Sequence, residues 1–331
     1  MGTRTARRRP CVRAGGGVRS ARRGAARVRE RGAAVVTALL VVMLATAVVA
    51  GLFVRENVTL RSVENRLALS QTRWIERAAL DWAKVILRAD ARSGVVDHLG
   101  EPWAVPVADT RLDETVTAGA KISDASRSAM LAGQMFDAQA RFNLASLVQN
   151  GMPSPAHVVA FRRLAGSVGV PESVVDVIVA RMLRSTPRTV NGNTVPATDL
   201  PLVRLADLVT IPGVEPAMVE ALAPFTIVLP RPTLVNINTA APEVVSAVIP
   251  QLDLAGARRF VARRERTFFR DLNDASMQID GQPVLAPNLL AVGSNYFLVR
   301  GMVRFDRVEA STETLLERST DRVEIIWQQR Y

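Results

Sequence analysis

Four oxygen-bearing side chains in the C-terminal third are the residues whose types and spacing could bind a metal ion. Asp271, Asn273, Asp274 and Asp280 offer the carboxylate and amide oxygens that Ca²⁺ prefers. The same residue types are common in turns and at the starts of helices. We therefore keep Asp271, Asp274 and Asp280 as weak metal candidates, which calorimetric titration with calcium would test.

Groups typical of catalysis are scarce. The chain has two histidines and one cysteine, and it contains no HExxH, phosphate-loop or serine-elbow motif. His98 has no second ligand at metal spacing, so we interpret it as structural. The sequence predicts no enzyme, no small-molecule substrate and no required cofactor.

Two stretches suggest phosphate binding instead. Residues 208–217 and the segment that begins at 236 are similar to helix-hairpin-helix units, which hold phosphate through backbone N–H groups freed by glycines. Glu215 replaces the second glycine of the first unit, and residues 249–253 contain no glycine in the second. Both changes remove features that an anion site needs, so we expect no nucleic-acid partner. A membrane-tethered DNA receptor is kept as the alternative function. Several arginines downstream could contact phosphate, but such clusters are more often solvated or partner-facing: Arg258, Arg259, Arg263, Arg264 and Arg266.

All these groups lie downstream of one dominant apolar segment. Residues 33–54 form an uncharged run of 22 residues. At the rise of an α-helix this run extends about 33 Å, which is enough to cross a hydrocarbon core of about 30 Å. We predict a single transmembrane helix.

The positive charge of the chain is concentrated before that helix. Residues 1–32 carry eleven arginines and one acid, Glu30, whereas the whole chain has a net charge of +11, so the remainder carries +1. A basic leader keeps its side of the membrane cytoplasmic. We therefore expect a single-pass membrane protein with a cytoplasmic N-terminus, in which everything after Val54 lies outside the cytoplasm.

The junction between the leader and the helix differs from that of a secretory signal. Such a signal has a shorter apolar core followed by small residues at the cleavage site, whereas here the small residue Gly32 precedes the apolar run. This order resembles the prepilin signal, in which a membrane peptidase cuts after the glycine and leaves Ala33 as the first residue. An uncut signal-anchor helix is an equally good interpretation of this segment alone.

A helical pattern continues beyond the apolar run. The chain has no proline from residue 33 to 101, and apolar side chains recur at three-, four- and seven-residue spacings. We predict that the helix ends near Arg92, before Gly94, and that Trp74 and Trp82 are core residues. The predicted stripe consists of Leu60, Val63, Leu67, Trp74, Ala78, Trp82 and Val85.

The rest of the chain predicts an α+β fold with a large all-α insertion. Residues 130–136 and Ile122 have strand character, as do 295–305 and 319–327, which we expect to form a hairpin joined by a polar loop. Prolines at the first turns mark several helices. The expected helices are 155–164, 171–183, 202–209, 216–222, 242–249 and 254–266.

The order of these features resembles the minor pseudopilins of the type II secretion system protein K family. The segment 137–147 is close to the family stretch Asp-x-Gln-Gly-Arg-Phe-Asn-Leu, and the segments 100–103, 235–240 and 294–297 also fit. The resemblance implies a pilin-like lollipop, in which a long N-terminal helix packs on a small antiparallel sheet. It also implies that the chain lies in the inner membrane with its C-terminal domain in the periplasm. On this basis the chain divides into a leader (1–32), a transmembrane half-helix (33–54), a first α/β part (55–136), the helical insertion (137–270) and C-terminal strands (271–331).

The resemblance also implies a role in assembly. Leu60, Val63, Leu67 and Trp74 would contact other minor pseudopilins and the major pseudopilin, after a prepilin peptidase has cut at Gly32 and Ala33 has been methylated. Most pilins carry a glutamate at the fifth mature position, where this chain has Thr37. A subunit with no neighbour above it does not need that acid, so the resemblance implies a place at the filament tip, where assembly starts. The alternative is that Thr37 is an ordinary helix residue whose hydroxyl bonds back to a carbonyl.

Calcium is the one ligand that the resemblance suggests. Family members use acidic clusters after the second helix of the insertion, but residues 184–193 of this chain contain no carboxylate. That site is expected to be missing or altered.

Overall fold

A computed structural model describes residues 26–111, 129–190, 193–305 and 308–331, and Ile122 lies outside these ranges. Its contacts divide the chain into two units, Met1–Asn65 and Arg66–Tyr331. The first helix, α1 (Ala26–Ser93), contributes to both units. The chain mixes helix with a small antiparallel sheet, so the predicted α+β class is confirmed.

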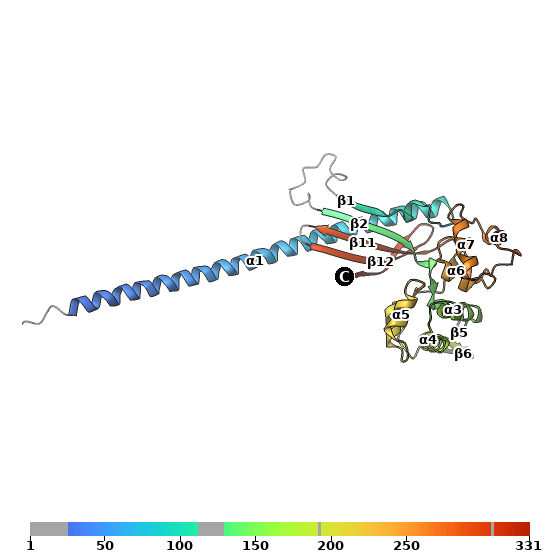
Figure 1. Ribbon diagram of the computed structural model, residues 1–331, viewed down its shortest axis with the longest axis horizontal. Coiled ribbons are helices and arrows are strands. Elements are labelled where there is room, and N and C mark those ends of the chain that lie inside the picture. The colour runs from blue at the N-terminus through green and yellow to red at the C-terminus, as the bar shows by residue number, and fades with distance from the viewer. Residues whose placement is uncertain (1–25, 112–128, 191–192, 306–307) are drawn as a thin grey trace, which may run out of the picture. The chain divides into compact units, whose positions relative to one another are not determined.

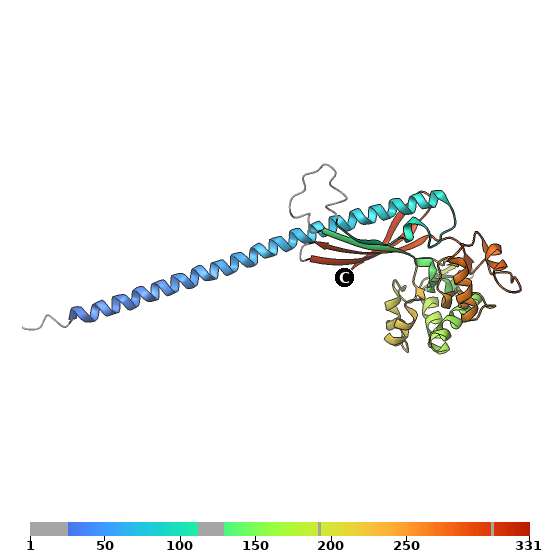
Figure 2. The same ribbon diagram turned by 45° about the horizontal axis from the view of Figure 1, so that its top comes forward.

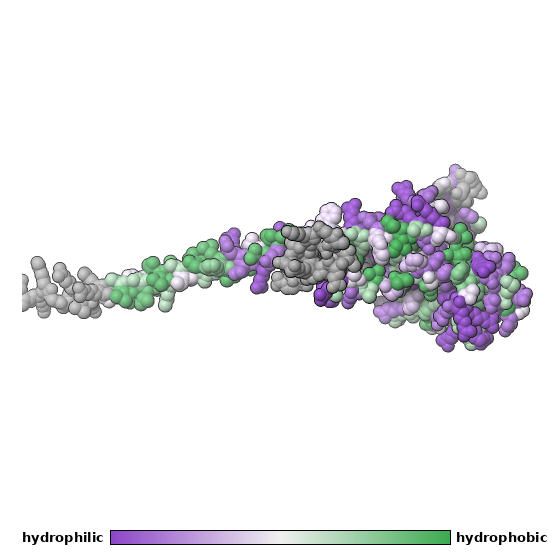
Figure 3. Space-filling model, turned by 90° about the horizontal axis from the view of Figure 1, so that it is seen from above, coloured by the Kyte–Doolittle hydropathy of each residue, from purple (hydrophilic) through white to green (hydrophobic). Residues whose placement is uncertain are grey.

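The described part of the N-terminal unit is the first part of α1, up to Asn65. The helix from Gly32 onward is long and apolar enough to cross a membrane, with a mean hydropathy of 2.7 over its best window. Its side chains are exposed throughout this part and form the continuous hydrophobic surface in Figure 3. The helix ends at Ser93, directly before Gly94, and confirms the end predicted near Arg92.

In the second unit, α1 packs through a stripe different from the predicted one. Trp74 and Trp82 are 68% and 54% exposed, so the prediction that both are core residues was wrong. The buried stripe has smaller side chains, which let the helix approach a sheet closely, whereas two indole rings would hold it away. The buried stripe consists of Ala68, Thr72, Glu76, Leu80, Ala83 and Leu87.

The sheet has five antiparallel strands in the order β1-β2-β11-β12-β13, and the C-terminal part of α1 lies along it (Figure 1). β11 is the central strand and pairs with β2 so that Phe297 lies opposite Asp137 and Phe305 lies opposite Ala129. The strands are β1 (Val107–Arg111), β2 (Ala129–Asp137), β11 (Tyr296–Phe305), β12 (Val308–Arg318) and β13 (Val323–Arg330).

The strand β12 corrects the predicted C-terminal hairpin. Residues 295–305 and 319–327 were expected to pair through a polar loop, but the segment between them is itself a strand that pairs with both β11 and β13. Its inward side chains include Thr312 and Thr314, which are buried beside Leu316. Because threonine is compatible with a buried strand as well as with a loop, the polar composition of the segment was misleading.

A compact apolar cluster joins α1 to this sheet. Leu87 of α1 and Trp103 pack with Met135, Phe297 and Leu316 from three strands. Trp103 belongs to the short helix η1 (Pro102–Ala104) and meets Phe297 edge-on, with ring centroids 5.1 Å apart. Burial of one large aromatic side chain typically contributes about 3 kcal/mol. The segment 100–103 therefore anchors the loop after α1.

The remaining helices form a separate layer beyond one end of the strands, in the second unit (Figure 2). Proline occupies the first turn of α3, α5 and α6, as predicted, while the expected helix at 202–209 is a 3₁₀ helix. The elements are α3 (Pro155–Ser167), α4 (Glu172–Arg184), η5 (Leu205–Thr210), α5 (Pro216–Leu222), α6 (Pro242–Val248), α7 (Leu254–Arg264) and α8 (Leu272–Met277).

The helical region has its own hydrophobic core, which continues past the expected boundary at 270. Ala275, Ile279 and Leu290 belong to the same buried cluster as the helices before them. The described part of this region also contains four two-stranded sheets of short strands, so it is not purely helical. The short elements are η3 (Ala138–Ala140), β3 (Phe142–Asn143), η4 (Leu144–Leu147), β4 (Val148–Gln149), β5 (Met152–Pro153), β6 (Arg188–Val190), β7 (Asn193–Val195), β8 (Thr226–Ile227), β9 (Val235–Asn236) and β10 (Leu290–Ala291).

Candidate functional site

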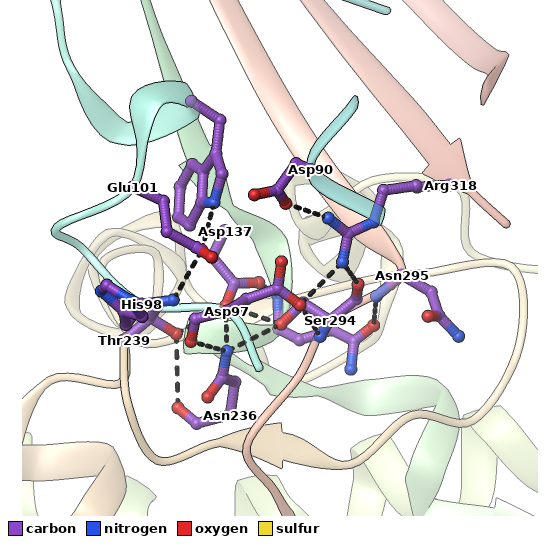
Figure 4. Close-up of polar contacts among 12 residues, drawn as sticks. Asp90, Asp97, His98, Glu101, Asp137, Asn236, Thr239, Ser294, Asn295 and Arg318 are labelled. Carbon is purple, nitrogen blue, oxygen red and sulfur yellow. Dashed lines mark hydrogen bonds and ion pairs between the residues drawn. The ribbon is translucent and has the colours of Figure 1, made fainter. Parts of the chain in front are cut away.

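A buried arginine joins the end of α1 to the end of β12. Arg318 donates from Nη1 to Asp90 in the last turn of α1, and from Nη2 to Asp97 at 2.7 Å (Figure 4). The Arg318 side chain is 7% exposed, and its guanidinium also covers the Phe297 ring. The attraction between two buried charges offsets their loss of hydration only when the remaining hydrogen-bonding groups are also satisfied. Here two carboxylates and the Ser294 carbonyl satisfy the guanidinium.

A second buried carboxylate lies where β2 enters the helical region. Asp137 Oδ2 accepts hydrogen bonds from Thr239, Ser294 and Asn236 at 2.6 to 2.9 Å, and Oδ1 accepts from the Gln139 backbone. The last bond makes Asp137 the N-cap of η3. One carboxylate therefore holds the sheet, the helical region and the connection into β11.

Asn236 connects the Asp137 carboxylate to the backbone of Asp97. Its Nδ2 atom donates to the Asp97 carbonyl, Asp137 and Ser294 (Figure 4), and its Oδ1 atom accepts from Asn238 N. Asn236 is fully buried, so an unmet polar atom there would be costly. We name the group Asp90, Asp97, Asp137, Asn236, Ser294 and Arg318 the polar clasp.

Burial governs the ionisation of the clasp. Loss of hydration raises the pKa of Asp137 above its ordinary value, although hydrogen bonds from Ser294 and Thr239 act in the opposite direction. The pKa of Asp97 is raised for the same reason, against the effect of Arg318. Burial and the nearby charge of Glu101 raise the pKa of Asp90.

The segment after Asp137 forms a second set of bonds across the helical region. Asn143 donates to the Arg231 carbonyl and accepts from the Leu229 and Ala145 backbones, while Ser146 donates to Thr233. Each bond spans more than 80 residues of sequence except the one to Ala145. The segment 137–147 thus ties the start of the helical region to the chain that leaves it.

Two carboxylates of the clasp, Asp90 and Asp97, form an acidic group with Glu101 that could in principle bind a cation. In the part of the chain that the structure describes, the carboxylate oxygens of Asp90, Asp97 and Glu101 lie within 4.8 Å of one another. The Arg318 guanidinium pairs with two of them, and Glu101 accepts from the His98 backbone and the Trp103 indole. These residues do not fit a metal ion, because their carboxylate oxygens already pair with the Arg318 guanidinium or accept hydrogen bonds from the His98 backbone and the Trp103 indole.

Comparisons with known proteins show which family this chain is similar to. Family models described as type II secretion system (T2SS), protein K, match residues 140–231 and 235–293. The chain is also 29% identical over 317 residues to type II secretion system protein K of Pseudomonas aeruginosa, which covers 86% of this chain and 88% of that protein. The predicted resemblance to the type II secretion system protein K family is confirmed.

Two further matches agree with this assignment. Type II secretion system protein K of Pectobacterium carotovorum subsp. carotovorum is 24% identical over 339 residues, or 92% of this chain and 97% of that protein. The crystal structure of the GspK-GspI-GspJ complex from the enterotoxigenic Escherichia coli type 2 secretion system contains a chain of the same fold, with a TM-score of 0.64 and 19% sequence identity. The match covers 81% of this chain and 99% of that chain. The predicted family and its coarse function, a minor pseudopilin of type II secretion, are confirmed.

The residues suggested as a calcium site in this chain have other roles. Asp271 caps α8 by accepting from Asn273 N and Asp274 N at 2.8 Å, and Asp274 accepts from Arg270 N at 3.1 Å. Asp280 is exposed. These contacts are typical of helix capping, and the structure does not gather Asp271, Asp274 and Asp280 into one group.

The side chains around the loop after α4, where family members place acidic residues, are also unsuited to bind calcium. The nearest acid from a neighbouring segment, Asp199, pairs with Arg184 at 2.8 Å and with Arg181 at 3.5 Å. Two arginines beside one carboxylate repel a divalent cation. The donor set is therefore unsuited to calcium in the described part of this loop.

The processing and assembly residues of the pseudopilin interpretation all lie on α1. Gly32 and Ala33 fall inside the helix, and Thr37 Oγ1 donates to the Ala33 and Ala34 carbonyls at 3.1 and 3.0 Å. The hydroxyl of Thr37 is thus satisfied within its own helix. The side chains of Leu60, Val63, Leu67 and Trp74 are 48 to 68% exposed.

The two helix-hairpin-helix stretches keep the backbone of such units without their anion site. Gly213 adopts a φ of +87° before α5, which matches a hairpin turn. At the start of α7, however, Asp253 accepts from the Gly256 backbone N–H at 2.7 Å, so this N–H group is not free to bind a phosphate. The arginines downstream are also divided, because Arg264 is buried whereas Arg258 is exposed. These contacts disfavour the DNA-binding alternative.

Sequence reasoning missed most of the clasp. Asn236 and Ser294 lie within stretches that resemble the family, which was a usable signal. Arg318 gave none, because it ends a strand that was taken for a loop. Asp90 and Asp97 were not singled out from the sequence, because single acids near the end of a helix carry no local signal of burial.

Proposed function

We propose that this chain occupies the tip of the type II secretion pseudopilus, starts its assembly and supports export of folded proteins across the outer membrane. The resemblance to the protein K family supports a role as a minor pseudopilin. The other minor pseudopilins are its proposed partners, because the E. coli protein of the same fold was solved in a complex with GspI and GspJ. The major pseudopilin, a prepilin peptidase and membrane lipid complete the proposed contacts.

The observation that carries this proposal is the second apolar stripe of α1. The buried stripe already packs on the sheet, yet Leu67, Trp74, Trp82 and Val85 present 53 to 68% of their surface outward. Large exposed apolar side chains in a row mark contact surfaces, and tryptophan is enriched in them. Helices of neighbouring subunits are the partners that fit a helical stripe.

Thr37 supports the tip position. A glutamate at this place would need a positive partner among apolar helices, because an unpaired carboxylate in a membrane is expensive. The hydroxyl of Thr37 needs none, since the Ala33 and Ala34 carbonyls accept from it. The helical region points the same way, because a bulky insertion is easier to place at a filament end than inside a regular array.

Membrane insertion follows from charge and length. The arginines of residues 1–32 keep the leader cytoplasmic, and the apolar part of α1 places the folded domain in the periplasm. Cleavage between Gly32 and Ala33, with methylation of Ala33, then frees the helix for assembly. We propose no catalytic activity, no nucleic-acid partner and no calcium requirement.

Two experiments test the proposal. N-terminal sequencing of the protein extracted from membranes with an active prepilin peptidase should begin at Ala33, and a start upstream of Ala33 would contradict processing. Immunogold labelling of pseudopili should mark one end of each filament. Labelling along the whole length would rule out the tip position while leaving the family assignment intact.

A further inference from the structure

A cavity of about 320 Å³ lies between the loop after α1 and the C-terminal end of α7. Its lining includes His98 and Leu99 from the loop, Asn238 from the segment after β9, and Arg264 from α7. Cavities of this size accept small ligands or single side chains. None of the roles described above uses this cavity.

Arg264 brings a buried positive charge to the cavity, which the nearby carboxylates of Glu265 and Asp137 offset only in part. The residue is 8% exposed, and its Nη1 atom donates to the Ile237 carbonyl at 2.6 Å. Within the described chain, Nε and Nη2 of Arg264 have no hydrogen-bond partner, and no carboxylate forms an ion pair with them. Arg264 lines the cavity, and neither nitrogen is among the fully buried side-chain atoms that lack a hydrogen-bond partner.

The other walls are held firmly. The Asn238 amide donates to the Phe269 carbonyl and accepts from the Phe269 N–H, which fixes the turn that carries Phe268. The rings of His98 and Phe268 stack with centroids 4.0 Å apart and an interplanar angle of 6°. His98 Nδ1 accepts from Gly100 N, so the neutral ring carries its proton on Nε2 and can donate there.

We propose that this cavity binds an organic carboxylate through the free N–H groups of Arg264, with Arg266 at the rim and the His98–Phe268 stack as an apolar wall. A guanidinium presents a planar fork of donors that matches a carboxylate. Burial lowers the pKa of Arg264 only to about 10, so the side chain stays charged at neutral pH. The carboxylate source is an acidic side chain of a neighbouring protein or a small carboxylic acid.

The cavity favours a monoanion over phosphate. Glu265 also lines it, and its negative charge repels a dianion more strongly than a carboxylate. The exposed side chains of Leu99 and Phe268 offer apolar contact to the carbon chain next to the carboxyl group.

Ligand-observed NMR on the full-length chain in detergent micelles tests the site. The probes are N-acetylglutamate N-methylamide, its glutamine counterpart, acetate and inorganic phosphate. We expect the glutamate probe to bind at least about tenfold more tightly than the glutamine probe, because a charge-assisted pair is lost in the latter. Tighter binding of the glutamate probe than of acetate indicates a protein side chain, and equal binding indicates a small acid.

Variants separate this site from general charge attraction. Arg264→Gln should weaken the glutamate probe about tenfold or more, Arg266→Gln should weaken it less, and the exposed control Arg270→Gln should leave it unchanged. Arg264→Lys, which keeps the charge but loses the fork, serves if Arg264→Gln does not fold, and it should also weaken binding. Equal affinity for the glutamate and glutamine probes, stronger binding of phosphate, or no effect of the Arg264 and Arg266 variants would overturn the proposal.

Discussion

Arg318 at the end of β12 reaches Asp97, 221 residues earlier in the chain, with 2.7 Å between Nη2 and Oδ2. The same guanidinium holds Asp90 in the last turn of α1. This pair therefore fixes the end of the helix against the sheet next to the entry into the helical region. Three parts of the second unit meet at one buried charge.

Removal of that charge should destabilise the folded domain. Arg318→Met leaves Asp90 and Asp97 buried without a cation, and we expect a loss of about 3 to 5 kcal/mol in the free energy of unfolding. Chemical denaturation of the full chain in micelles measures the loss. Arg322→Met is the matched control, because its partner Glu324 is exposed and such a pair contributes less than about 1 kcal/mol. Equal effects of the two variants would show that the clasp is not the stabilising feature.

Asp137 should make stability depend on pH. Its folded-state pKa is raised by burial above the unfolded value of about 3.9, so between these two values the folded state binds more protons. The stabilisation that this proton gives is fully present below the unfolded pKa and is lost as the pH rises through the folded pKa. Asp137→Asn cannot titrate, so the stability difference between wild type and Asp137→Asn should favour wild type most near pH 4.

Denaturation curves at several pH values between about 4 and 8 measure this difference. The Asp321→Asn variant is the control for the loss of one carboxylate at an exposed position. A wild-type advantage that grows with pH would mean that the hydrogen bonds to Asp137 outweigh its burial.

Trp74 and Trp103 should separate assembly from folding. Trp74→Ala should change the free energy of unfolding by less than about 0.5 kcal/mol, because its ring is 68% exposed, yet it should reduce co-purification with other minor pseudopilins. Trp103→Ala removes a fully buried ring and should cost about 3 to 5 kcal/mol. Unchanged co-purification of Trp74→Ala would remove the exposed stripe from the interface.

Gly293 and Gly166 should respond in opposite directions to alanine. A Cβ at Gly293 would overlap the Val95 carbonyl oxygen beside the clasp, so Gly293→Ala should cost about 1 to 3 kcal/mol. Gly166 lies in α3 with open space around it, and Gly166→Ala should stabilise by up to about 1 kcal/mol. Thermal unfolding of both variants measures the contrast, and stabilisation by Gly293→Ala would contradict the close approach of the two loops.

Removal of divalent cations should have no effect. Asp271 and Asp274 cap α8, and Asp199 is paired with arginines, so we expect the melting temperature to be the same in calcium and in EDTA. A rise in melting temperature with calcium, together with saturable heat in calorimetric titration, would reveal a site that these contacts do not suggest.

Local patterns in the sequence determined much of this protein. The apolar run, the prolines at helix starts and the segment 137–147 predicted α1, most later helices and the family, because these signals act over a few neighbouring residues. The tertiary structure alone decided which stripe of α1 is buried. Both stripes have helical spacing, and the stripe without the two indole rings is the buried one because it lets the helix approach the sheet.

The clasp also required the tertiary structure. Arg318, Asp97 and Asp137 come from distant segments, and each is an ordinary polar residue in its own neighbourhood. Their burial depends on β12 being a strand, which is stabilised by pairing with β11 and β13 rather than by its own composition. Charge pairs of this kind form only after long-range contacts have excluded water, so the sequence offers no local trace of them.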